Sequence, residues 1–311
     1  MINKQRVLTI LLLILLLPSL AAGQYRRRRA ASTNRYDNYH FLSVSLAGGY
    51  GSLDENITGA VTTGSIAAQT SLGYEFRRAG FWINVSGQLA MWNAETKFEQ
   101  FTTAKRGADS EGDQATFFYT IDQTDNHRWY TVGVPIILGY YVSGFYFGFG
   151  AKVAFNMYST TNSKGTYELS AQYDDYEGIF RNMPERGYTT YHFDQSQKVK
   201  LNPHGYLLGE VGYDLLSNVS TNSEVCNMLK IAFYFEYGLN SVLNDVKIPS
   251  RIIIDQTNAT RAQVNPYFTS ALASKDRVAP YFLGVKLTYL FGGSNTGRTG
   301  TWHRGCQCYG H

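Results

Sequence analysis

The sequence predicts an all-β fold, a closed antiparallel transmembrane β-barrel of about eight strands with long extracellular loops and short periplasmic turns. Three observations predict it. Apolar residues alternate with small or polar ones in successive segments, the charged residues of those segments share one phase, and connections alternate between long and short. The chain is rich in Gly (30), Tyr (24) and Phe (18) and poor in Pro (7), and its mean hydropathy is −0.25.

The N-terminus has the features of a secretory signal peptide. Lys4 and Arg6 precede an apolar run over residues 7–17, and the small residues Ala21, Ala22 and Gly23 follow. This run is shorter than the ~20 residues of a membrane-spanning helix. We therefore expect a signal peptide at 1–23 and a basic periplasmic arm at 24–39.

The first four predicted strands cover residues 41–51, 69–76, 81–92 and 129–141. In the first, Leu42, Val44 and Leu46 form an apolar face that alternates with small residues. In the fourth, Pro135 interrupts the pattern, because proline cannot donate a hydrogen bond to the neighbouring strand.

The last four predicted strands cover residues 145–158, 206–214, 229–240 and 281–291. The first of these has the clearest alternation, with Phe145, Phe147 and Phe149 in one phase. Residues 206–214 have the weakest. An error there would reverse every later strand and move Cys226 from the periplasmic side to the surface.

Charged residues occupy only the second phase of these strands. A basic residue that faces the middle of a bilayer costs about 2–4 kcal/mol, so a membrane barrel excludes it from the lipid face. An eight-stranded barrel has an interior that side chains just fill, and buried charges must be paired. We therefore expect a paired interior network that plugs the lumen, made of Glu75, Arg77, Lys152, Glu210, Lys230, Glu236 and Lys286. A narrow ion pathway lined by them is the alternative.

The lengths of the connections favour an outer-membrane barrel over a soluble β-sandwich, which would alternate in the same way. Long connections at 52–64, 93–128, 159–204 and 241–279 alternate with shorter ones at 78–80, 143–144 and 215–228. Outer-membrane barrels have short periplasmic turns and long outer loops. The barrel then spans 40–291, and both termini are periplasmic, with a C-terminal tail at 292–311.

Three segments carry a resemblance to a known family. They are residues 134–140 (VPIILGY), residues 145–150 (FYFGFG) after a tight turn, and residues 237–240 (YGLN) before a long loop. Together they resemble the small outer-membrane barrels of Bacteroidetes, which include OmpA-like barrels and the PorT-like accessory barrels of type IX secretion. The resemblance implies the cell outer membrane and a role as an accessory to secretion or envelope machinery, and it brings no catalytic residues.

The cysteines and the tail offer a contact to partners. Cys226 is expected in a periplasmic turn, and Cys306 and Cys308 lie in the tail. A disulfide from Cys226 to the tail, or a tether to a periplasmic or secretion-machinery protein, suits an oxidising compartment. Zinc or copper binding, with His303 and His311, is a weaker alternative, because a flexible tail offers no supporting residues.

Other functions have little support in the sequence. The charge falls from +4 to +2 when Lys4 and Arg6 are removed, which gives no reason to expect a nucleic acid partner. We expect no cofactor and no enzyme activity, since no nucleophile elbow or metalloprotease helix is present. Residue types suited to hydrolysis do occur in the loops, at His127, Asp174, Asp175, His192 and Ser196. Aromatic residues in the loops at 93–128 and 159–204 are expected to pack together where strands extend beyond the membrane, or else to form a binding surface.

Overall fold

The structure is a computed structural model, and it describes residues 38–55, 59–109, 111–142, 144–175, 178–181, 183–218, 226–243, 252–255, 258–266 and 278–295. The predicted signal peptide, residues 24–37 of the predicted arm and residues 296–311 of the predicted tail, with Cys306 and Cys308, lie outside these residues. Residues 38–39 and 292–295, predicted as parts of the arm and the tail, belong to strands of the barrel. Among the described residues, no helix has the length and apolar character needed to cross a membrane.

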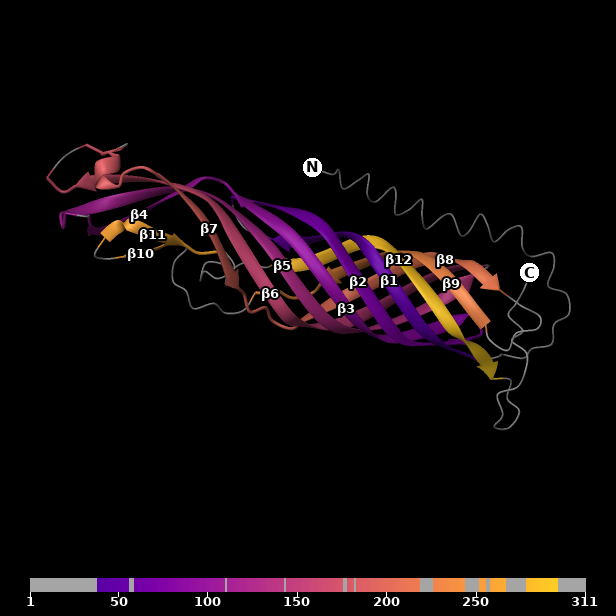
Figure 1. The fold of residues 1–311 in the computed structure, drawn as a ribbon. Helices are drawn as coiled ribbons and strands as arrows, with labels where there is room; N and C mark the ends of the chain where they lie inside the picture. Colours follow the sequence, from indigo (N-terminus) through magenta and orange to yellow (C-terminus); the bar gives the residue numbers. More distant parts are fainter. Residues whose placement is uncertain are drawn as a thin grey trace.

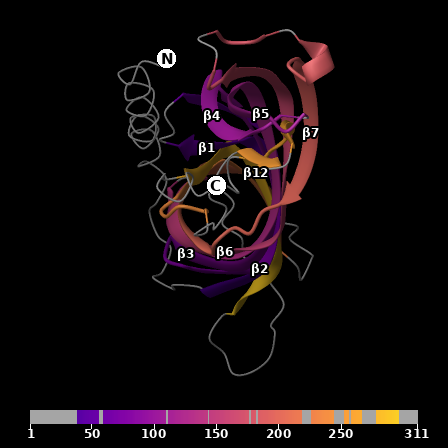
Figure 2. The same cartoon turned by 90° about the vertical axis from the view of Figure 1, so that its left-hand side faces the viewer.

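Eight strands form a closed antiparallel barrel, which confirms the predicted fold class (Figure 1; Figure 2 looks along it). Each pairs with the next, and the last pairs with the first to close the ring. In ring order they are β1 (Asn38–Glu55), β2 (Ala60–Arg78), β3 (Phe81–Phe98), β5 (Gln114–Val142), β6 (Phe145–Tyr173), β8 (His204–Asn218), β9 (Cys226–Gly238) and β12 (Val278–Asn295). The weak sixth segment is β8, so every later strand runs as predicted.

The alternation in sequence becomes the two faces of the barrel wall. Successive side chains of a strand point to opposite faces. Outward residues are apolar and exposed, for example Leu46 (61% exposed) and Phe233 (72%), whereas inward residues such as Trp92 are buried. Pro135 lies within β5 opposite Lys152 of β6, at a point where the pairing of β5 with β3 is interrupted between Gly133 and Ile136.

The short connections lie at one end of the barrel, together with the strand ends at Asn38 and Asn295. Arg78 pairs directly with Phe81, so only Ala79 and Gly80 connect β2 to β3. Both adopt positive φ, at 52° and 86°, as a two-residue hairpin turn requires. Cys226 is the first residue of β9, and its backbone pairs with Gly292 at this end. The prediction that it lies in a turn is therefore wrong.

The strands are longer than predicted at the opposite end. β5 and β6 each have 29 residues and continue beyond the barrel as a hairpin. There β5 pairs with β4 (Phe101–Ala108) and β6 with β7 (Thr190–Lys198). These four strands form what we call the extension, which projects along the barrel axis (Figure 1). A small hairpin of β10 (Ile252–Asp255) and β11 (Asn258–Val264) lies near it, and the 3-10 helix η2 (Pro184–Arg186) precedes β7.

Candidate functional site

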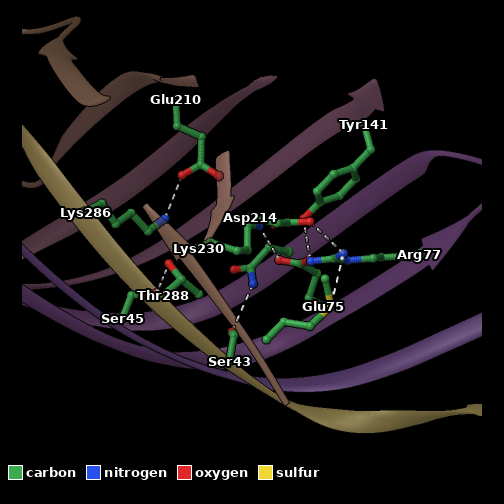
Figure 3. A network of polar contacts seen from close by, with 12 residues as sticks. Ser43, Ser45, Glu75, Arg77, Tyr141, Glu210, Asp214, Lys230, Lys286 and Thr288 are labelled. Carbon is green, nitrogen blue, oxygen red and sulfur yellow. Dashed lines mark hydrogen bonds and ion pairs between the residues drawn. The ribbon is translucent and has the colours of Figure 1, made fainter. Parts of the chain in front are cut away.

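The first feature of the barrel interior is a charge cluster near the short turns, drawn in Figure 3. Glu75 of β2 accepts hydrogen bonds from Arg77 Nε (2.7 Å) and from Lys230 Nζ of β9 (3.1 Å). Its side chain is 1% exposed. Arg77 also lies 3.9 Å from Asp214 of β8, and its guanidinium sits 4.1 Å from the centre of the Tyr141 ring. One carboxylate thus bonds two cations, and aromatic rings cover both, since Lys230 Nζ lies 4.1 Å from the centre of the Tyr146 ring.

The second feature of the interior is a single ion pair that crosses the lumen about halfway along the barrel. Lys286 Nζ of β12 donates to Glu210 of β8 at 2.8 Å. Beside it, the hydroxyls of Ser45 and Thr288 are hydrogen-bonded at 2.9 Å across the β1–β12 seam (Figure 3). The pair therefore joins β12 to a strand that is not its neighbour in the sheet.

A third group lies nearer the extension. Lys152 Nζ of β6 donates to Glu236 of β9 (2.5 Å) and to Gln88 of β3 (2.9 Å). Glu236 is fully buried, and it also accepts a hydrogen bond from the Tyr234 hydroxyl at 2.6 Å. The ammonium of Lys152 lies 4.1 Å from the centre of the Tyr206 ring, at cation–π distance. Three strands are therefore tied together in the centre of the lumen.

Stacked aromatic rings fill the lumen above this group. Trp92 of β3 is fully buried and stacks on Trp129 of β5 and on Tyr206 of β8, with ring centres 5.8 Å and 6.0 Å apart. Phe282 of β12 meets Trp92 edge-on at 6.0 Å. Rings from four strands thus meet across the lumen at one level.

Two loop segments close the mouth of the barrel at the end that carries the extension. Leu201 and Leu243 form a backbone bridge, and their side chains are buried with Val199 and Val242 in the same cluster as the stacked rings. A small cavity of about 10 Å³ beside Trp129 is the size of roughly one water molecule. Apolar side chains therefore cover the mouth of the lumen.

All seven interior charges predicted from sequence point into the lumen and are ion-paired there. With Asp214 they form five pairs among four carboxylates and four cations. This balance matters because an unpaired buried charge is costly. The stacked rings of Trp92, Trp129, Tyr206 and Phe282 occupy positions in the inward phase of their strands, which is the sequence signal that could have indicated them. Leu201 and Leu243 lie outside the named strands, so strand alternation gives no signal for them.

The extension has a hydrophobic core of its own. Phe117, Tyr119 and Ile121 of β5 are fully buried against Leu169 of β6 and against Val264 of β11. The Phe117 ring meets the Tyr188 ring edge-on, with centres 6.2 Å apart. The aromatic residues of the loops at 93–128 and 159–204 therefore pack together in extended strands, as the first of the two interpretations expected.

At the end of the extension farthest from the barrel, which we call the tip, hydrogen bonds join Asp109, Tyr173, Arg186 and Tyr188. We call this group the latch, and the sequence did not indicate it. The Tyr173 hydroxyl donates to Asp109 Oδ2 at 2.6 Å and also contacts the Tyr188 hydroxyl. Asp109 Oδ1 accepts two backbone N–H bonds at 2.9 Å, from residues 111 and 113. Arg186 donates to Tyr173 at 3.3 Å. The loop after β4 is therefore tied to the loop before β7.

We expect this latch to open only in acid. Burial raises the pKa of the Asp109 carboxyl, but hydrogen bonds from Tyr173 and from backbone N–H groups outweigh burial and place the pKa below its ordinary 3.8. A lowered folded-state pKa gives stability that is present above the ordinary pKa and is lost as the pH falls through the folded-state value. The protection factors of the amides at the tip, which correct for the intrinsic pH dependence of exchange, should therefore stay constant from pH 7 to 5 and fall below pH 3.8.

Two variants distinguish loss of the Asp109 contacts from general unfolding in acid. Asp109→Asn should lower the protection factors at the tip at pH 7 and remove their dependence on acid, because the neutral amide accepts weaker bonds and does not titrate. Glu111→Gln is the matched control. The Glu111 side chain is exposed, and its ion pair with Arg186, at 3.4 Å, lies on the surface, where such pairs contribute little to stability. Equal exchange in Asp109→Asn and the wild type at pH 7 would contradict the latch.

The latch also includes a group of carboxylates with metal-like spacing. Asp109, Glu111 and Asp113 place one oxygen each within 4.8 Å of one another. Both oxygens of Asp109 already accept hydrogen bonds from the protein, and Glu111 pairs with Arg186. We assign no metal to this group.

The residue types suited to hydrolysis are spread over the extension. His127 of β5 faces inward, and its Nδ1 lies 2.9 Å from the Thr161 hydroxyl. Asp174 is exposed just after β6. His192 and Ser196 lie on the exposed face of β7, separated by roughly 13 Å at ~3.3 Å per residue. The structure does not bring these side chains together.

Comparisons with known proteins add little. No protein-family model and no curated protein matches the sequence. Among solved structures, it is similar to Neisserial surface protein A (NspA), with 9% identity over 79% of this chain and 95% of that one and a TM-score of 0.30. It is also similar to Ail, the attachment invasion locus protein of Yersinia pestis, with 7% identity, coverage of 82% and 99%, and a TM-score of 0.27. The strand pairing of this chain by itself defines the barrel.

Proposed function

We propose that this protein is a non-conducting outer-membrane β-barrel that holds the extension outside the cell as an interaction surface. One observation carries the proposal. The lumen is filled by paired charges and stacked rings, while the extension has a separate core beyond the barrel. A barrel whose lumen is filled cannot conduct solutes, so we infer that the ends of the barrel contact its partners.

The outer wall of the barrel supports a membrane location. Outward side chains form a continuous apolar surface, with Leu72, Val134, Phe149, Phe155 and Leu283 each exposed by 50% or more. The charged residues at the level of this surface, such as Lys152, Glu210 and Glu236, face inward, whereas exposed ones such as Arg78 and Arg128 lie nearer the strand ends or the extension. A soluble protein rarely exposes so large an apolar surface, whereas the hydrocarbon core of a bilayer requires one.

The positions of the short turns and of the extension support an orientation in the membrane. Short turns lie at the end with Asn38 and Asn295, which is the periplasmic pattern, and the extension lies at the other end (Figure 1). The periplasmic end then offers the tail and its cysteines to secretion or envelope machinery, as the family resemblance implies. We also propose that the protein has no catalytic activity.

The edge of β7 is the part of the extension best suited to a partner. Leu169 N–H donates to the Thr189 carbonyl and Val199 N–H to the Ser159 carbonyl, which fixes the hydrogen-bonding phase of β7. By alternation, the backbone groups of the even-numbered residues 190–198 point away from β6. Among the described residues no strand pairs with this edge. Such a row of backbone groups can accept an extended segment of another protein.

Single-channel recording in a planar bilayer tests the proposal. We expect no steady open level at neutral pH, because the ion pairs and rings described above obstruct the lumen. A porin with a water-filled lumen is the positive control. A steady open level in the wild type would overturn the proposal and favour a narrow channel lined by the interior charges.

A further inference from the structure

A groove of about 900 Å³ lies on the outer wall of the barrel beside the β2–β3 turn. Its sides come from four successive strands of the ring, β2, β3, β5 and β6. Gly80 in the turn brings the backbone close to the Tyr140 ring, since an added Cβ would lie 2.9 Å from that ring. The close approach of Gly80 to the Tyr140 ring therefore shapes the groove at the turn.

The groove is apolar along its length and charged at one end. Phe81, Leu138 and Phe147 line it and are 66%, 58% and 53% exposed on the lipid-facing wall. Phe81 and Tyr140 meet edge-on with ring centres 4.8 Å apart, at the level where aromatic girdles form. Of the ten lining residues only Arg78 is charged, and it lies at the turn.

Arg78 differs from its neighbour Arg77 in its surroundings. Arg77 points into the lumen and pairs with Glu75, whereas Arg78 is the exposed last residue of β2. Within the described part of the chain, no carboxylate forms an ion pair with Arg78. The guanidinium is thus held at the membrane edge above an apolar groove, without an anion from the barrel.

We propose that this groove binds one anionic phospholipid of the inner leaflet. The inference rests on the membrane location and orientation proposed above. Arg78 binds the phosphate, because a guanidinium donates two parallel hydrogen bonds to phosphate oxygens. One acyl chain lies against Phe81, Ile83, Leu138 and Phe147, and the aromatic pair marks the interface between headgroup and chain.

Native mass spectrometry of the barrel released from vesicles tests this binding. The vesicles contain equal amounts of phosphatidylglycerol and phosphatidylethanolamine, and the readout is the retained phosphatidylglycerol per barrel. We expect Arg78→Gln to lower it about fivefold, as suits one arginine at an anionic surface. Arg128→Gln is the matched control, because Arg128 is also exposed but lies near the opposite end, hydrogen-bonded to Asn93.

A second variant tests the apolar part. Leu138→Trp fills the groove while keeping the wall apolar, so it should also lower retained phosphatidylglycerol although Arg78 is intact. Heat-dependent gel migration reports whether each protein has inserted as a barrel. If the wild type fails to insert, the proposed function fails. If all variants insert and retain as much phosphatidylglycerol as Arg128→Gln, the lipid site is overturned.

Discussion

Glu236→Ala is expected to lower the free energy of unfolding of the barrel by about 3–5 kcal/mol. Glu236 is fully buried and Lys152 is 2% exposed. Removing the carboxylate leaves the ammonium between Gln88 and the Tyr206 ring, without a counter-charge and away from water. The Tyr234 hydroxyl also loses its acceptor. The loss thus combines an unpaired charge with an unsatisfied donor.

Urea unfolding in lipid vesicles, followed by tryptophan fluorescence, measures this loss. The double variant Lys152→Met, Glu236→Leu removes both charges and should recover most of the stability. Asp194→Ala is the surface control. Its partner Lys164 lies 3.6 Å away and both side chains are more than half exposed, so its loss should cost less than about 1 kcal/mol. Equal losses for Glu236→Ala and Asp194→Ala would show that the interior pair is solvated.

Alternation along single strands predicted the strands and the phase of the charged residues, and the lengths of the connections favoured a barrel over a sandwich. Each side chain's face follows from its position in a strand, so Lys152 and Glu236 could be placed inside without knowing their partners. Even the weak segment at 206–214 was correct, because Leu207, Val211 and Tyr213 keep one phase. Strand ends were less accurate, since alternation in β5 continues past Trp129 into the extension.

The pairings across the lumen could not be predicted from sequence. Lys230 meets Glu75 although they are 155 positions apart, and this contact depends on the stagger of the strands around the closed ring. The latch at Asp109 depends on the meeting of two irregular loops, whose backbone has no periodic signal. The position of a residue in the alternation shows which face of the barrel wall its side chain occupies. Its partner across the lumen depends on how the strands are staggered in the closed barrel.

Phe117→Ala is expected to open the extension while the barrel stays folded. The Phe117 side chain is fully buried between β5, β6 and the Tyr188 ring. Loss of a buried phenylalanine costs about 3–5 kcal/mol. The core of the extension is separate from that of the barrel, so the loss of stability should appear as local opening of the extension.

Hydrogen exchange by segment measures this opening, with fast exchange expected in residues 114–123 and 165–173 and unchanged exchange in 130–140. Phe118→Ala is the matched control, because Phe118 is the next residue of the same strand, points to the other face and pairs with Ser170. Its ring is partly exposed whereas that of Phe117 is fully buried, so its loss should raise exchange less than the loss of Phe117. If the barrel opened together with the extension, the two cores would form one cooperative unit, and the extension could not change shape on binding a partner without loosening the barrel that holds it.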